Sequence, residues 1–143
     1  MNKPMQGFPL SIKLDHRVGE TTAELMLMFY YIDKAGIKHC SHPHLCTDGL
    51  SIPKFLWSIF GPPFASVYLA AGIIHDSLCY DAGKMAATGN MLRAQQMRLA
   101  ADDLFREMLL FLGSGRAMAW AMYRGARIGS ASLRRIVVTH KTA

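Results

Sequence analysis

The amino-acid sequence predicts an α+β fold, in which an N-terminal β-hairpin or small antiparallel sheet packs on three to four mainly antiparallel helices. Three observations carry this prediction. Residues 8–48 contain an apolar, partly aromatic run that is followed by turn residues. Residues 51–129 contain long segments with helical patterning. Residues 130–143 form a basic tail, and a length of 143 residues is typical of a single domain.

The N-terminal region carries the pattern of a β-hairpin. The run Leu25–Ile32 is apolar with aromatic residues and a β-branched end, which is typical of a strand. The turn residues Asp33-Lys34-Ala35-Gly36 follow it directly. We therefore expect a second strand to begin at Ile37 and to pair with the first.

A short helix is expected to open the helical region. Ser51 is a typical helix cap and Pro53 a typical first-turn residue, so this helix is predicted to end near Phe60. The run over residues 55–74 carries no charge and has the length of a membrane-spanning helix. Gly61-Pro62-Pro63 divides that run, because proline removes backbone donors and breaks a helix, so no transmembrane segment is expected.

Three longer helices are predicted after these prolines. Residues 67–74 are apolar on every side, which indicates a helix that is buried all round and ends near Tyr80. Residues 81–90 are rich in small and polar side chains and are predicted to form a loop. The last two helices are predicted over residues 91–112 and 115–128.

The composition excludes two classes of protein. With 51% hydrophobic and 18% charged residues, the chain is not predicted to be disordered. Its three cysteines and the absence of an apolar signal segment in Met1–Leu10 argue against a secreted disulfide framework. A cytoplasmic location without a signal peptide is therefore expected.

The charge is distributed unevenly along the chain. Sixteen Lys and Arg exceed ten Asp and Glu, and the whole excess lies from residue 116 onward, where no acidic residue occurs. Such a segment can bind an anionic surface, although a solvated helix face is the simpler interpretation. The arginines concerned are Arg116, Arg124, Arg127, Arg134 and Arg135.

The strongest candidate for a functional site begins at His75-Asp76. These polar residues end an otherwise apolar helix, and burying either one without a partner costs several kcal/mol. Adjacent helical residues point about 100° apart, so each is expected to find a partner on another element. Asp102, on an antiparallel third helix, is the expected partner of His75. The alternative is that these groups only satisfy one another and the backbone at a helix end.

Asp102 is expected to be partly buried on the third helix. The helical repeat places it beside the apolar stripe that includes Leu104 and Phe105, whereas Asp103 falls on the opposite face. Arg98 precedes Asp102 by one turn, so an ordinary helical ion pair is the alternative to a functional role.

The loop Thr47-Asp48-Gly49-Leu50-Ser51 is a second candidate. Its simplest role is a turn stabilised by the Asp48 side chain, with Ser51 capping the next helix. The Asp48 carboxylate can also supply an oxygen ligand beside Asp76 for a hard divalent cation such as calcium.

Residues 39–46 have the composition of a zinc cluster. In an extended strand Cys40 and Cys46 would lie about 20 Å apart at ~3.3 Å per residue, which is too far for one tetrahedral zinc ion. A contribution of two zinc ligands, His42 and His44, remains open.

Several of these motifs together resemble a family pattern. They are the TDGLSIP segment at residues 47–53, Trp57 with Gly61-Pro62-Pro63, His75-Asp76, and the R-x-x-A-D-x-x-F spacing from Arg98 to Phe105. The pattern is similar to that of the small phage and prophage proteins of domain-of-unknown-function family DUF1353, over about residues 25–127. This resemblance implies a phage or prophage origin, with a location in the host cytoplasm or the virion, and no established activity.

The helix pair also resembles, over a smaller part of the chain, that of the phospholipase A2 superfamily. This second resemblance implies that His75 is a general base, that Asp102 orients it and that Asp76 binds calcium. The chain lacks the glycine-rich calcium loop and the disulfides of that superfamily. It also carries Cys79 where the superfamily has a tyrosine, with Tyr80 one place later.

The sequence thus predicts a small phage-encoded hydrolase in which His75 activates water and Asp102 fixes its tautomer. A divalent cation held by Asp48 and Asp76 is expected to stabilise a developing oxyanion. The alternative is a non-enzymatic virion component or host-interaction protein, in which the cluster is structural and the basic C-terminal segment is the contact surface. The predicted supporting residues are Thr47, Ser51, Arg98 and Tyr80.

Overall fold

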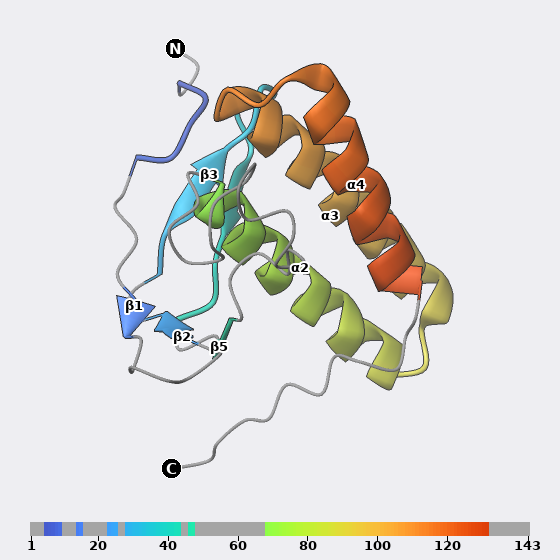
Figure 1. Ribbon diagram of the computed structural model, residues 1–143. Helices are drawn as coiled ribbons and strands as arrows, with labels where there is room; N and C mark the ends of the chain where they lie inside the picture. The colour runs from blue at the N-terminus through green and yellow to red at the C-terminus, as the bar shows by residue number, and fades with distance from the viewer. Residues whose placement is uncertain are drawn as a thin grey trace.

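The computed structural model describes residues 5–9, 14–15, 23–25, 28–43, 46–47 and 68–131. Within these residues the predicted α+β fold is confirmed, because small antiparallel sheets precede three helices (Figure 1). The predicted short helix at residues 51–60 and the Gly61-Pro62-Pro63 turn lie outside the described residues.

The described strands form two small antiparallel sheets. The strands are β1 (Leu14–Asp15), β2 (Ala23–Leu25), β3 (Tyr30–Ile32), β4 (Lys38–Cys40) and β5 (Cys46–Thr47). One sheet has the order β1-β2-β5, and the other pairs β3 with β4 so that Tyr31 lies opposite His39.

The predicted turn between the hairpin strands is confirmed, and Asp33 explains it. Its Oδ1 accepts hydrogen bonds from the backbone N–H groups of Ala35 (2.9 Å) and Ile37 (2.8 Å), and Gly36 supplies the positive φ of +86°. The other oxygen, Oδ2, lies 2.8 Å from Nε2 of His39. Burial alone raises the pKa of Asp33, but the hydrogen bonds from His39 and the backbone lower it below its usual value.

The prediction of one strand over Leu25–Ile32 is wrong. β2 ends at Leu25 and β3 begins at Tyr30, in a different sheet. Between them the N–H of the fully buried Phe29 donates to Oγ of Ser41 (2.9 Å), while its carbonyl accepts from the N–H of Ser41 (2.8 Å). The Ser41 side-chain oxygen thus accepts the hydrogen bond that a carbonyl of a neighbouring strand would accept within a sheet. The apolar run therefore continues from one sheet into the other.

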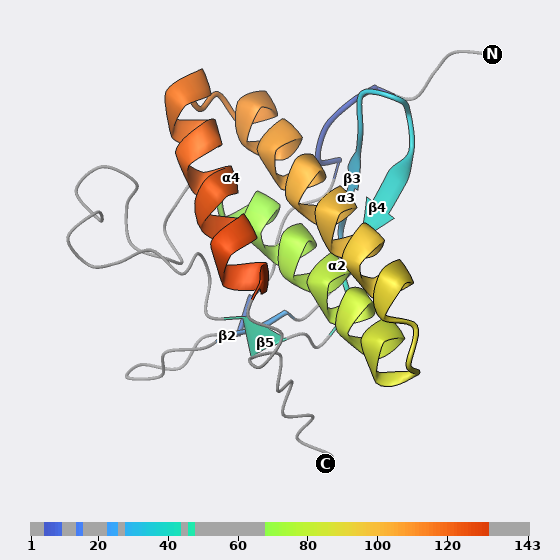
Figure 2. The ribbon, with the colours of Figure 1, turned by 90° about the vertical axis from the view of Figure 1, so that its right-hand side faces the viewer.

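The helices of the described fold are α2 (Leu69–Ala87), α3 (Met91–Phe111) and α4 (Arg116–Ala131). Consecutive helices run antiparallel, and α3 packs against both α2 and α4 (Figure 2). The core lies where the helices meet the hairpin, and its fully buried side chains include Phe29, Tyr31, Ile73, Ile74 and Met108. Burial of each large apolar side chain contributes roughly 1.5–3 kcal/mol.

The prediction of a loop over residues 81–90 is wrong, because α2 continues to Ala87. Alanine, lysine and methionine are strong helix formers, and in this segment they outweigh the cost of Gly83. The chain turns at Gly89, which has a φ of +89°. Asn90 then caps α3 by accepting a hydrogen bond from the N–H of Arg93 (3.1 Å).

None of the helices in the described part of the chain combines the length and the apolar character that a membrane crossing needs.

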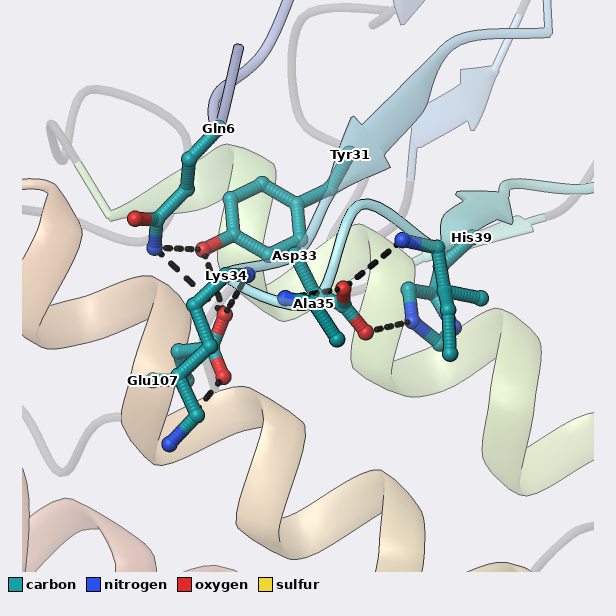
Figure 3. Close-up of polar contacts among 8 residues, drawn as sticks. Gln6, Tyr31, Asp33, Lys34, Ala35, His39 and Glu107 are labelled. Atoms are coloured by element: carbon teal, nitrogen blue, oxygen red, sulfur yellow. Dashed lines mark hydrogen bonds and ion pairs between the residues drawn. The ribbon is translucent and has the colours of Figure 1, made fainter. Parts of the chain in front are cut away.

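Glu107 of α3 connects the hairpin to the helices (Figure 3). Its Oε1 accepts hydrogen bonds from the Tyr31 hydroxyl (3.0 Å), the Lys34 backbone N–H (2.9 Å) and the Gln6 amide (3.4 Å). The Gln6 amide also donates to the Tyr31 oxygen (2.7 Å). Burial and, less strongly, the nearby Glu107 carboxylate raise the pKa of Tyr31 to about 12.

Replacing Glu107 with Ala is expected to lower the free energy of unfolding by about 1–3 kcal/mol, because the buried Tyr31 hydroxyl then has no acceptor. Denaturant unfolding measures this change. Lys34→Ala is the control: its side chain is 79% exposed and its ammonium lies 3.9 Å from Glu107 Oε2, so its removal costs less than about 1 kcal/mol. Equal effects of the two substitutions would contradict this role of Glu107.

Candidate functional site

The candidate site is a His/Asp pair between α2 and α3. The predicted approach of His75 and Asp102 is confirmed, because His75 Nε2 lies 2.7 Å from Asp102 Oδ1. The His75 side chain is 13% exposed, whereas the Asp102 side chain is fully buried. The antiparallel packing of the two helices brings the residues together, and each lies at the border of an apolar helix face.

The second oxygen of Asp102 faces α4. Arg127 places Nη1 at 3.8 Å from Oδ2, and its own side chain is 37% exposed. A buried carboxylate is costly without compensating charge, and here an imidazole and a guanidinium lie on its two sides. One carboxylate therefore links all three described helices.

Cys79 lies one helical turn after His75 and completes the cluster. Its buried sulfur is 3.5 Å from Nε2 and 3.9 Å from Nδ1 of His75. The donor atoms of His75, Cys79 and Asp102 all lie within 4.8 Å of one another, and nitrogen, sulfur and oxygen donors of this kind can bind zinc. The 2.7 Å separation of His75 and Asp102 is that of a hydrogen bond, so the geometry already satisfies both groups without a metal.

The environment of His75 favours its protonated form. Burial alone lowers the pKa of the imidazole, but the hydrogen bond to Asp102 and the contact with Cys79 outweigh it. The negative charge of Asp76 acts in the same direction, and together these effects raise the pKa to about 10. The ring also packs on Phe105, with ring centroids 4.8 Å apart. At neutral pH His75 is therefore expected to be an imidazolium.

The other predicted site residues on α2 and α3 are Asp76, Tyr80 and Arg98, and not all of them belong to this cluster. Asp76 is half-buried on the next position of α2, and Arg98 is buried (7% exposed) one turn before Asp102. The Tyr80 ring packs edge-on against His42, at a centroid distance of 5.4 Å. Tyr80 thus faces the hairpin side of α2.

Of the predicted loop at residues 47–51, only Thr47 lies in the described part of the chain. Thr47 belongs to β5, where its backbone pairs with Ala23 of β2. Five predicted residues lie outside the described residues, and their roles stay predictions: Asp48, Ser51, His44, Arg134 and Arg135.

His42, one of the two predicted zinc ligands, takes part in a second His/Asp pair. Its Nε2 lies 2.8 Å from Asp81 Oδ1, and both side chains are more than one third exposed. Its backbone N–H donates to Oγ of Ser77 (3.2 Å), which in turn donates to the Ile73 carbonyl (3.0 Å). This second pair attaches the end of the hairpin to α2.

Sequence reasoning missed two contacts of the cluster, those of Cys79 and Arg127. The four-residue spacing from His75 to Cys79 places both on one helix face, and this signal was available. The sequence pattern assigns Arg127 only to a basic segment that can bind an anionic surface. Its contact with Asp102 depends on the rotation of α4 about its axis, which the sequence pattern does not fix.

Comparison with known proteins places the chain in a family. The model of the family described as "Protein of unknown function (DUF1353)" matches residues 23–126. Two similar proteins are "Uncharacterized protein y4jT" and "Uncharacterized protein y4iH", both of Sinorhizobium fredii (strain NBRC 101917 / NGR234). No solved structure matches the chain.

These two relatives are longer than the matched chain. The first is 43% identical over 56 residues, which are 39% of this chain and 17% of the relative. The second is 33% identical over 79 residues, which are 54% of this chain and 33% of the relative. The family model, by contrast, matches most of the chain. The chain therefore belongs to the DUF1353 family.

Proposed function

We propose that this protein is a hydrolase in which the His75–Asp102 pair activates water to cleave an ester bond. The observation that carries the proposal is the 2.7 Å contact between His75 Nε2 and the fully buried Asp102 carboxylate. A buried carboxylate that orients an imidazole is a recurring arrangement in general-base catalysis. Because Asp102 occupies Nε2, Nδ1 is the nitrogen that accepts a proton.

The proposed reaction needs no further reactant. Nδ1 of neutral His75 takes a proton from water as the water oxygen attacks the ester carbonyl carbon. The tetrahedral intermediate then loses its alkoxide, which receives the proton from Nδ1, and the products are a carboxylic acid and an alcohol. Asp102 holds the Nε2 proton and stabilises the imidazolium formed between the two steps.

The raised pKa of His75 means that the imidazole must be deprotonated before this reaction can begin. The imidazole acts as a base only after it has lost the proton that Asp102 stabilises. The proposed activity therefore increases as the solution becomes alkaline. Asp102, Cys79 and Asp76 favour the protonated form of His75, so these residues set the pH at which activity begins.

The cation predicted to bind Asp48 and Asp76 is a separate part of the proposal. Carboxylate oxygens suit a hard ion such as calcium, which would supply positive charge beside a developing oxyanion. The half-buried Asp76 fits this chemistry, and Asp48 lies outside the described residues. No step of the reaction above depends on it.

The test is release of fatty acid from vesicles of phosphatidylcholine and phosphatidylglycerol, together with hydrolysis of a soluble aryl ester. We expect the parent protein to hydrolyse at least one of these esters, faster at alkaline than at neutral pH. His75→Gln is expected to lower the rate about a hundredfold or more, because the base is removed. Repeating the assay with calcium and with a chelator tests the cation separately.

His42→Gln is the matched control, because it removes the imidazole of the more exposed His42–Asp81 pair. We expect this variant to keep the parent rate within about twofold. Absence of hydrolysis in every assay, or a full rate in His75→Gln, would remove the hydrolase proposal.

A second candidate is a non-enzymatic phage virion component or host-interaction protein, in which the cluster only stabilises the fold. The full burial of Asp102 and its contacts on both oxygens favour this candidate. Under it, His75→Gln leaves every ester-hydrolysis rate equal to that of the parent while lowering stability. Both proposals include the phage or prophage origin that the sequence resemblance implies.

A further inference from the structure

α4 presents two chemically different faces. Its inner face packs on the core through Ala119, with Met122 and Ala126 beside it. Its outer face carries residues spaced by four, which align along one side of a helix. These outer residues are Arg116, Trp120, Arg124 and Ile128, and we call them the α4 stripe.

Two apolar side chains of the α4 stripe are open to solvent. Trp120 is 54% exposed and Ile128 is 73% exposed. The Arg124 guanidinium lies over the Trp120 ring, 5.3 Å from its centroid. The exposed residues beside the stripe are small, Ala117, Ala121 and Gly125, so the large side chains project beyond their neighbours.

The charge around the α4 stripe favours an anionic partner. Residues 1–115 contain equal numbers of basic and acidic residues, so the net charge of +6 comes from residue 116 onward. Three of the six basic residues of this segment, Arg116, Arg124 and Arg127, lie on α4. Arg116 and Arg124 flank Trp120 on the stripe, and no acidic residue occurs on α4. α4 lies at one edge of the described helices (Figure 2).

The chemistry of the stripe distinguishes among anionic partners. Apart from its two arginines it holds no side chain that reads base edges, and Arg124 covers one face of the Trp120 ring on which a nucleobase would stack. A second copy of the chain would bring arginines against arginines. A bilayer surface, in contrast, accepts exposed Trp and Ile into its interface while lipid phosphates bind the arginines.

We propose that the α4 stripe is a peripheral binding surface for bilayers that contain anionic phospholipids. Trp120 and Ile128 enter the interface, and Arg116 and Arg124 pair with the headgroup phosphates. The 16-residue helix is about 24 Å long at 1.5 Å per residue and lies along the surface rather than across the bilayer. The proposed membrane binding does not depend on the proposed ester hydrolysis.

The test is co-sedimentation of the His75→Gln protein with vesicles, because this variant separates binding from hydrolysis. Vesicles of pure phosphatidylcholine are compared with vesicles that also contain phosphatidylglycerol. We expect binding at least tenfold tighter to the anionic vesicles, and weakening at high salt, because the arginine contacts are screened.

Two double variants separate the apolar and charged parts of the stripe. Trp120→Ser with Ile128→Ser removes the apolar contacts, and Arg116→Gln with Arg124→Gln removes the charges. Each is expected to weaken binding to anionic vesicles roughly tenfold or more. The matched control, Leu92→Ser with Arg93→Gln, changes a 69% exposed leucine and an exposed arginine on α3, and it leaves binding unchanged.

Three results would overturn the proposal. The first is equal affinity for the two kinds of vesicle, or no binding to either. The second is undiminished binding of both stripe variants while circular dichroism shows them folded. The third is tighter binding of a single-stranded DNA oligonucleotide, or stripe-dependent dimerisation in sedimentation, either of which assigns the stripe to a different partner.

Discussion

Replacing Asp102 with Asn is expected to lower the free energy of unfolding by about 3–5 kcal/mol, because one partner of a buried ionic contact is removed. His75 and Arg127 both face this carboxylate, which has no exposed surface. An asparagine keeps the shape but has no charge to balance theirs, and its amide N–H₂ group is a donor that cannot replace a carboxylate oxygen facing a cation. Denaturant unfolding at neutral pH measures the loss.

Asp103→Asn is the matched control for this prediction. Asp103 is the next residue of α3, has the same charge and is exposed. Its substitution is expected to change the free energy of unfolding by less than about 0.5 kcal/mol. If the two variants are equally stable, the Asp102 cluster does not stabilise the fold.

Helical geometry explains why the pairing of His75 with Asp102 could be predicted from sequence. Each residue is a polar side chain at the border of an apolar helix face, where burial requires a partner. α2 and α3 are joined by a short turn and are therefore antiparallel, so their borders can meet. The family pattern pointed to the same residues, and the family model matches residues 23–126.

Contacts that depend on distant elements could not be predicted in the same way. The Asp102–Arg127 contact requires the orientation of α4, and the interruption of the strand at Phe29 requires the side chain of Ser41. The segment at residues 81–90 looked like a loop by composition, yet its helix formers extend α2 to Ala87. Local patterns therefore predicted the elements better than their ends or their partners.

The stabilising contribution of His75 is expected to disappear as the pH rises. Its pKa in the folded protein is raised to about 10, above the ordinary value of about 6.5 that it takes in the unfolded chain. The folded state therefore binds the proton more tightly, and the contribution is complete below pH ~6.5 and is lost as the pH rises toward ~10. Among the described residues, Asp102, Cys79 and Asp76 act on the ring, and Arg127 lies 3.8 Å from the second oxygen of Asp102.

Thermal melting of the parent and of His75→Gln over this pH range measures the effect. The parent is expected to be the more stable protein at mildly acidic pH, and the difference is expected to shrink steadily as the pH rises. The comparison cancels the titration of groups that both proteins share. A difference that stays constant or grows with pH would show that His75 is not protonated preferentially in the folded state.

The proposed role of Asp102 is to hold the Nε2 proton of His75 and to leave Nδ1 to exchange protons. Long-range proton–nitrogen NMR spectra of the histidine rings test it directly, with His75→Gln used to assign the signals. We expect His75 to carry protons on both nitrogens at neutral pH and to lose the Nδ1 proton only at alkaline pH. We also expect Asp102→Asn to return the pKa of His75 toward about 6.5. A neutral His75 at neutral pH, or a neutral ring with its proton on Nδ1, would show that Asp102 does not have this role.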